Sequence, residues 1–174
     1  MIVHGFDIYR VYLSAPGDLG REREACYAAI AAINESAAAE HKILLAPVGL
    51  RDESQILANR AVVSDNMRES SIFIQLFQDE WGPEGLHRKL FYSAIDARDD
   101  ASLPMREVIV GLKDAPRETD PAVLAFRQEL EQQPGVRVLH FGKPEEWRAQ
   151  LAGLMAESVK AIVASGGGVR AEAS

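Results

Sequence analysis

Strand-like and helix-like segments alternate strictly along this chain, and this alternation constrains the fold more than any other feature. The five strand-like segments are short and apolar: 8–14, 42–48, 72–77, 107–112 and 136–141. Segments with apolar residues at helical spacing follow each of them: 19–37, 55–70, 89–98, 121–133 and 144–165. Consecutive parallel strands need helical crossovers, so this pattern predicts a parallel sheet with helices on both faces. Five strands favour a flavodoxin-like α/β three-layer sandwich with strand order 2-1-3-4-5.

Local signals support this assignment. The run Ile72 to Phe77 is apolar throughout, which indicates a strand that is covered on both faces. Asp120-Pro121 is a typical helix start, with a capping residue before a proline at the first helical position. Gly17 and Asp18 suit the start of the first helix, because a short carboxylate there can accept backbone N–H groups.

Length and charge limit the classes of function. A chain of 174 residues predicts one domain, here 1–165, with 166–174 as a flexible tail or the start of a linker. The net charge of −7 argues against a protein that tracks nucleic-acid phosphates. No apolar run approaches the roughly 18 residues of a membrane span, and the N-terminus lacks the features of a signal peptide. We therefore expect a cytoplasmic protein that binds neither nucleic acid nor membrane, with its single cysteine, Cys26, buried in the core.

In the predicted topology a crevice lies between the carboxyl ends of the first and third strands. Two segments reach it, Ser14 to Asp18 and Phe77 to Gly85. The candidate binding residues at this crevice are Ser14, Pro16, Gly17, Asp18, Arg23, Glu80, Trp81 and Gly82. Arg23 is either part of a solvated helix face, together with Glu22, or a structural clamp onto loop carbonyls or carboxylates around the third strand. Trp81 either covers the crevice, forms a contact surface or packs into the core.

The motifs of common enzymes are missing from the sequence. The four histidines are scattered, and neither paired metal-ligand spacings nor a Gly-x-Ser-x-Gly nucleophile elbow occurs. A flavin-phosphate loop needs several hydroxyl groups, but Ser14 to Asp18 offers one hydroxyl and an acid that would repel phosphate. A phospho-receiver needs an acid pair before Ser14 beside an acid such as Asp79, and that pair is absent. The sequence therefore assigns no catalytic residue and no metal ligand.

Two segments resemble a known family. Ser14-Ala-Pro-Gly-Asp-Leu-Gly-Arg-Glu-Arg, followed by Ile30, Ile33 and Asn34, is similar to the opening of TIR-like (Toll/interleukin-1 receptor-like) domains. The variant in question stands at the N-terminus of bacterial STAND NTPases and related defence or signalling proteins. Residues 66–82 resemble the family's next landmark, a helix end, a buried third strand and an aromatic-glycine loop, although Ser70-Ser71 stand where the family usually has an acid. The resemblance covers roughly residues 9 to 163.

The resemblance implies one of two activities. Some TIR domains associate with themselves or with partners as signalling modules. Others cleave NAD at the nicotinamide–ribose bond with a glutamate placed after the third strand, and the similar nucleoside deoxyribosyltransferases also use a glutamate there. That glutamate usually lies in a Glu-aromatic-x-x-Ala pattern. The matching stretch here is Leu90-Phe91-Tyr92-Ser93-Ala94, so a leucine replaces the carboxylate.

We therefore expect a crevice without an acid able to support cleavage of a sugar–base bond. The leading hypothesis is a non-catalytic TIR-like signalling or protein-interaction module without a cofactor, whose contacts are homotypic or heterotypic. The first alternative is an NAD or nucleoside N-glycosidase that uses a displaced carboxylate, Glu80 or Glu84. The second alternative is a sensor that binds a nucleotide in the crevice without turnover.

Overall fold

Five parallel strands form the centre of the structure, a computed structural model that describes residues 2–3, 5–116 and 118–167. The parallel strands are β2 (Phe6–Ser14), β3 (Ile43–Val48), β4 (Ser70–Phe77), β5 (Glu107–Lys113) and β6 (Val136–Phe141). They pair in the order β3-β2-β4-β5-β6, which confirms the predicted flavodoxin-like order 2-1-3-4-5. A short strand that the sequence did not predict, β1 (Ile2–Val3), pairs antiparallel with the start of β2.

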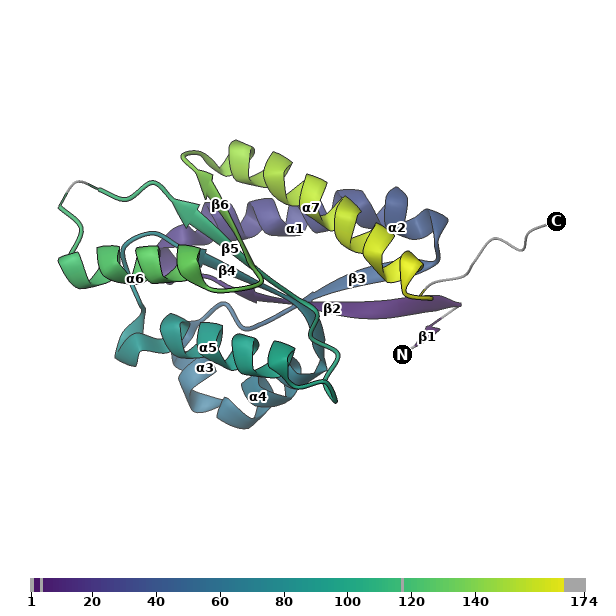
Figure 1. The fold of residues 1–174 in the computed structure, drawn as a ribbon, viewed down its shortest axis with the longest axis horizontal. Helices are drawn as coiled ribbons and strands as arrows, with labels where there is room; N and C mark the ends of the chain where they lie inside the picture. Colours follow the sequence, from purple (N-terminus) through teal and green to yellow (C-terminus); the bar gives the residue numbers. More distant parts are fainter. Residues whose placement is uncertain (1, 4, 117, 168–174) are drawn as a thin grey trace.

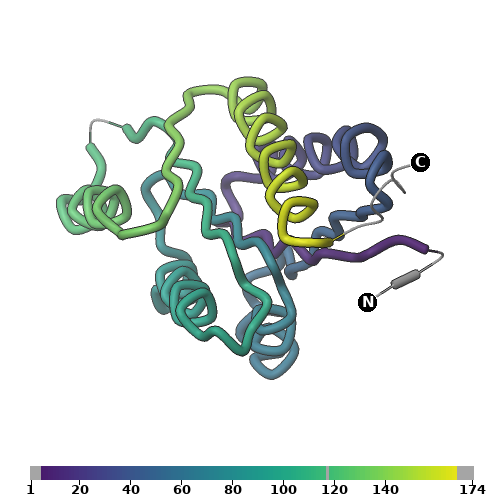
Figure 2. The backbone as a smooth tube through the Cα atoms, turned by 45° about the vertical axis from the view of Figure 1, so that its right-hand side comes forward, coloured from purple at the N-terminus to yellow at the C-terminus, as the bar shows by residue number. Residues whose placement is uncertain are grey.

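Helices cover both faces of this sheet (Figure 1). The α-helices are α1 (Gly20–Asn34), α2 (Ala37–Glu40), α3 (Glu53–Ala58), α4 (Arg60–Glu69), α5 (Leu86–Asp99), α6 (Pro121–Gln132) and α7 (Pro144–Ala164). Short 3-10 turns precede two of them, Gly17–Leu19 before α1 and Pro83–Gly85 before α5. Helices α1, α2 and α7 pack on one face and α3 to α6 on the other, an arrangement also visible in the rotated view of Figure 2.

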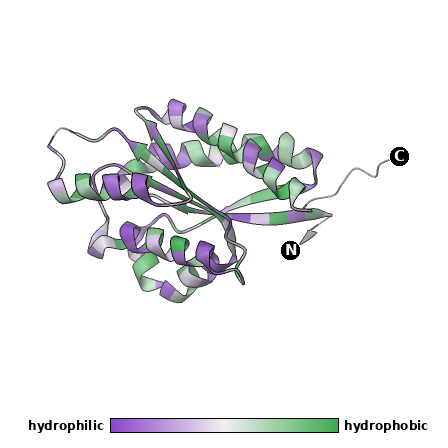
Figure 3. Ribbon diagram, in the orientation of Figure 1, coloured by the Kyte–Doolittle hydropathy of each residue, from purple (hydrophilic) through white to green (hydrophobic). Residues whose placement is uncertain are grey.

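The core has two halves, one on each side of the sheet. Side chains alternate along β4, so Ile72 and Ile74 belong to the α1/α7 half while Phe73 and Phe77 belong to the α3–α6 half. Every residue of β4 is buried, as the continuous apolar run predicts. In Figure 3 the central strands are mostly hydrophobic, whereas the helices carry both hydrophobic and hydrophilic residues. Cys26 is fully buried and receives the indole N–H of Trp147 at 3.0 Å, so its predicted core position is confirmed.

Several predicted helix boundaries were wrong. The predicted helix 55–70 is two helices, because Asn59 leaves the helical conformation (φ −122°, ψ 49°) and its side chain bonds back to the Gln55 carbonyl at 2.8 Å. The first part starts earlier than predicted, since the Asp52 carboxylate caps the N–H of Ser54 at 2.8 Å. Glu53 therefore lies in the first turn of a helix and not before the predicted helix 55–70.

The other differences are smaller. The first helix ends at Asn34 and a separate short helix begins at Ala37; together with the break at Asn59, this gives seven α-helices in the described residues instead of the five predicted. The predicted helix 89–98 is longer at both ends, because α5 runs from Leu86 to Asp99. The predicted tail falls mostly on 168–174, outside the described residues. None of the described helices is long and apolar enough to cross a membrane.

Candidate functional site

A polar network lies at the carboxyl edge of β2 and β4, where the fold predicts a crevice. Ser14 and Gln75 are register partners on the two strands, and the Gln75 amide donates to the Ser14 carbonyl at 3.2 Å. His87, in the first turn of α5, places its Nδ1 3.0 Å from the Ser14 hydroxyl. Their exposed fractions are only 2% for Ser14 and 1% for each of Gln75 and His87. The chain's own side chains therefore fill this part of the predicted crevice.

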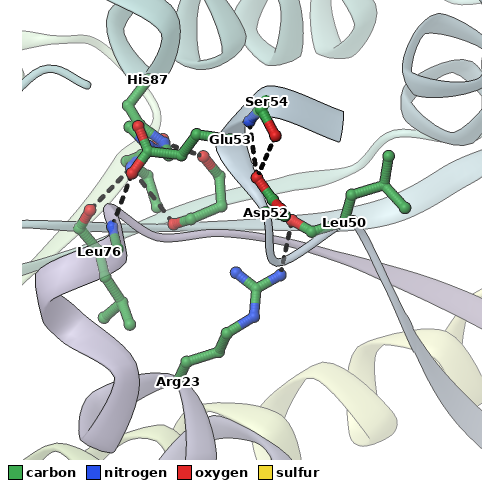
Figure 4. Close-up of polar contacts among 10 residues, drawn as sticks. Arg23, Leu50, Asp52, Glu53, Ser54, Leu76 and His87 are labelled. Carbon is green, nitrogen blue, oxygen red and sulfur yellow. Dashed lines mark hydrogen bonds and ion pairs between the residues drawn. The ribbon is translucent and has the colours of Figure 1, made fainter. Parts of the chain in front are cut away.

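Glu53 completes the network, and it is an acid at this edge of the sheet that the candidate residues from the sequence did not include. Its Oε1 accepts the backbone N–H of Gly17 at 2.8 Å, and its Oε2 lies 3.6 Å from Nε2 of His87 (Figure 4). Its side chain is 21% exposed. This carboxylate therefore satisfies the Gly17 donor at the turn before α1. The sequence carried a signal for it, because Asp52-Glu53-Ser54 is a helix start that follows the strand next to β2.

The loop after β4 packs closely against Glu53 and His87. Gly82 has a positive φ of 72°, and a Cβ added there would lie 2.6 Å from Glu53 Oε2 and 2.7 Å from His87 Cδ2. Only glycine fits such a close approach. Trp81 packs edge-on against Phe126 of α6, with ring centroids 5.9 Å apart, which supports the packing alternative for this residue.

Arg23 is a structural clamp. Its guanidinium donates to the carbonyls of Leu50 at 3.2 Å and Leu13 at 3.4 Å, and to the Tyr27 hydroxyl at 3.0 Å. Figure 4 shows this side chain directed at the loop that carries Leu50. The clamp thus holds the ends of the first and second parallel strands, and not the third as predicted. The alternative of a solvated face was also wrong for Glu22, which is 2% exposed and accepts from Lys113 Nζ at 2.7 Å.

Burial keeps His87 neutral. Desolvation lowers the pKa of His87, and this outweighs the opposing effect of the Glu53 carboxylate. A neutral ring satisfies both neighbours when Nε2 carries the proton and faces Glu53, while Nδ1 accepts the Ser14 hydroxyl proton. Among the described residues Nε2 has no partner at normal hydrogen-bond distance, because its contact with the Glu53 carboxylate is long, 3.6 Å.

Further acids surround this edge of the sheet. One oxygen from each of Asp18, Asp79 and Glu80 lies within 4.8 Å of the others. The pKa of Asp18 is raised by partial burial and then by the neighbouring carboxylates, and the pKa of Glu80 is raised mainly by Asp18. These three carboxylates have the spacing to hold a cation. They do not suit the phosphate of a flavin nucleotide, because Glu53 already occupies the Gly17 N–H and the surrounding charge is negative.

The position that the resemblance assigns to a catalytic glutamate lies elsewhere. Leu90 is 7% exposed and lines a groove of about 480 Å³ between α3–α4 and α5. Glu84 lines the same groove and pairs at 3.8 Å with Arg60. Of Glu80 and Glu84, the two alternative catalytic acids considered from the sequence, only Glu80 therefore lies with Asp18 and Asp79 at the carboxyl edge of the sheet. Pro16 lies in the turn between Ser14 and Gly17, where its carbonyl accepts the N–H of Leu19 at 3.0 Å.

Comparisons with known proteins inform the fold alone. No protein-family model matches the chain, and no curated protein matches it. Among solved structures, the metal-soaked Flv1 flavodiiron core from Synechocystis sp. PCC6803 is similar, with a TM-score of 0.50 and 10% sequence identity. The match covers 92% of this chain but only 37% of that protein. It supports the flavodoxin-like α/β fold and, at this identity, carries no inference about activity.

Proposed function

We propose that this protein is a TIR-like signalling module of bacterial signalling or defence, which acts through protein contacts and not through turnover. The residues that resemble the family support this proposal. The most important are Ser14 to Arg23, which include the turn before α1 and the Arg23 clamp at the edge of the crevice. The flavodoxin-like topology is compatible with it.

One observation carries the proposal: Ser14, Glu53 and His87 fill the crevice and contact one another or the backbone around them. The Ser14 hydroxyl and Nδ1 of His87 are in contact, Glu53 holds the Gly17 N–H, and Gly82 packs onto both Glu53 and His87. A substrate could reach Ser14 or His87 only if this network opened. Leu90 stands where the resemblance places a catalytic glutamate, and its apolar side chain likewise favours a module without turnover.

Light scattering on the full chain, coupled to size-exclusion chromatography over a hundredfold concentration range, tests the proposal. We expect a mass that rises with concentration toward that of a dimer or larger assembly, or a specific complex with a protein partner. A strictly monomeric protein that also captures no partner would contradict the proposal.

Glu53 supports a second candidate, an N-glycosidase. Its carboxylate lies at the carboxyl edge of the sheet and is partly exposed, and a carboxylate beside a ribose can stabilise an oxocarbenium-like transition state. Because Asp18, Asp79 and Glu80 make this edge negative, a nucleoside is a better substrate than the pyrophosphate of NAD.

Incubation with nucleosides and with NAD, followed by chromatography for the released base, tests this candidate. Turnover that Glu53→Gln abolishes and the matched control Glu84→Gln retains would establish it and displace the first proposal. Absence of released base with every substrate would eliminate it.

A further inference from the structure

The outward face of α5 has an unusual charge order. Its first turn carries Arg88 and Lys89 and no acid, while its last turn carries Asp96 and Asp99 with one base, Arg98. A helix macrodipole favours the opposite order, with acids at the N-terminus and bases at the C-terminus. The order of charges on α5 therefore slightly destabilises the isolated helix, so the stability of the helix itself does not account for the presence of these charges.

Most of this face is open to a partner. Lys89, Ser93 and Asp96 are exposed, and Tyr92 beside them is half-buried and donates its hydroxyl to Glu129 of α6; these four residues are the α5 face. Among the described residues neither Lys89 nor Asp96 takes part in an ion pair. The Ser93 hydroxyl bonds back to the Lys89 carbonyl at 3.0 Å, so the middle of the face is small and uncharged.

The α5 face forms a ridge between two hollows. On one side is the groove of about 480 Å³ toward α4, and on the other a hollow of about 590 Å³ beside Trp81 and Tyr92. Lys89, Ser93 and Asp96 line both hollows. A second ridge of the same shape could lie alongside this one, with side chains entering a hollow.

The charge pattern is complementary to itself. Lys89 and Asp96 are two helical turns apart, about 10 Å along the axis, and point in nearly the same direction. If two copies of α5 cross antiparallel around a two-fold axis between Tyr92 and Ser93, Lys89 of each copy faces Asp96 of the other. The same arrangement opposes the two macrodipoles and offsets the unfavourable order of charges within each helix. A two-fold interface must be self-complementary in this way.

We propose that the α5 face is the surface through which two copies of this chain associate, with α5 antiparallel to α5 and Lys89 paired with Asp96 of the second copy. This inference rests on the proposed function and adds to it the surface and the partner. The small Ser93 at the centre lets the two helices approach closely, and the half-buried Tyr92 supplies aromatic contact area next to it.

Charge exchange on the full chain tests the pairing. Each of Lys89→Glu and Asp96→Lys converts two attractive pairs per dimer into repulsive ones, so we expect each to raise the dimer dissociation constant about tenfold. The double variant Lys89→Glu/Asp96→Lys restores both pairs and is expected to return the constant to within about threefold of the original. Lys160→Glu, an exposed charge reversal on α7, is the matched control and should leave it unchanged.

Thermal unfolding separates loss of the interface from loss of the fold. Both single variants place a charge that the α5 dipole favours, so neither should lower the melting temperature of the monomer. A wild-type dimer that both single variants leave intact, or a double variant that fails to recover, would overturn the α5 interface while the proposed function stands. A wild-type chain that is monomeric throughout would overturn the interface, and only the further absence of any partner would contradict the proposed function.

Discussion

Replacing Glu53 should reveal how much the turn before α1 depends on a single carboxylate. Hydrogen bonds to charged groups contribute about 1.5–3 kcal/mol and neutral ones about 0.5–1.5 kcal/mol. Glu53→Ala removes the 2.8 Å bond to Gly17 and leaves the His87 ring facing no carboxylate, so we expect a loss of about 2–3 kcal/mol. Glu53→Gln keeps a neutral acceptor and relieves repulsion from Asp18 and Glu80, so it should cost about 1 kcal/mol or less.

Thermal and urea unfolding followed by circular dichroism measure these differences. In a domain of this size 1 kcal/mol corresponds to about 2–4 °C, so Glu53→Ala should melt roughly 4–12 °C lower and Glu53→Gln less than about 4 °C lower. Hydrogen exchange at the Gly17 amide should accelerate in the alanine variant alone. Glu84→Ala is the control, since its contact with Arg60 is long and exposed. Equal losses for Ala and Gln, or no loss for either, would refute the assignment of Glu53 as a hydrogen-bonded cap.

Two further predictions concern the charges near the crevice. Lys113→Met leaves the buried Glu22 carboxylate without its 2.7 Å partner and should lower the free energy of unfolding by about 3 kcal/mol. The double variant Lys113→Met/Glu22→Gln should recover most of this loss, which a double-mutant cycle measured by urea unfolding would show. Partial burial and neighbouring acids raise the pKa of Asp18, so the folded protein keeps the Asp18 proton to a higher pH than the unfolded chain does. As pH rises from the unfolded pKa through the folded pKa, the ionised Asp18 carboxylate therefore lowers the free energy of unfolding. Asp18→Asn should therefore raise stability at neutral pH, by about 0.5 kcal/mol at most, and this gain should shrink below pH 4; a lower melting temperature at pH 7 would contradict the repulsion.

Sequence patterns predicted the sheet order and most elements correctly, because hydrophobic period and proline signals act locally. Boundaries failed where a side chain broke or capped a helix, as at Asn59 and Asp52. The Arg23 clamp was anticipated because arginine can satisfy several carbonyls at once, but its partner Leu50 depends on how the second loop folds back. Glu53 was not predicted at the crevice, because the candidate residues all came from the segments after the first and third strands, whereas Glu53 follows the second.

The sequence by itself determined that this chain builds a parallel sheet with helices on both faces, because parallel strands require crossovers and a fully apolar strand must be covered on both sides. Only the tertiary structure decided which side chains meet at its edge. Ser14, Glu53 and His87 come from three distant segments, and strand register together with helix rotation bring them together. On α5, packing of the helix against the sheet turns His87 toward the crevice and Leu90, three residues later, toward the groove beside α4.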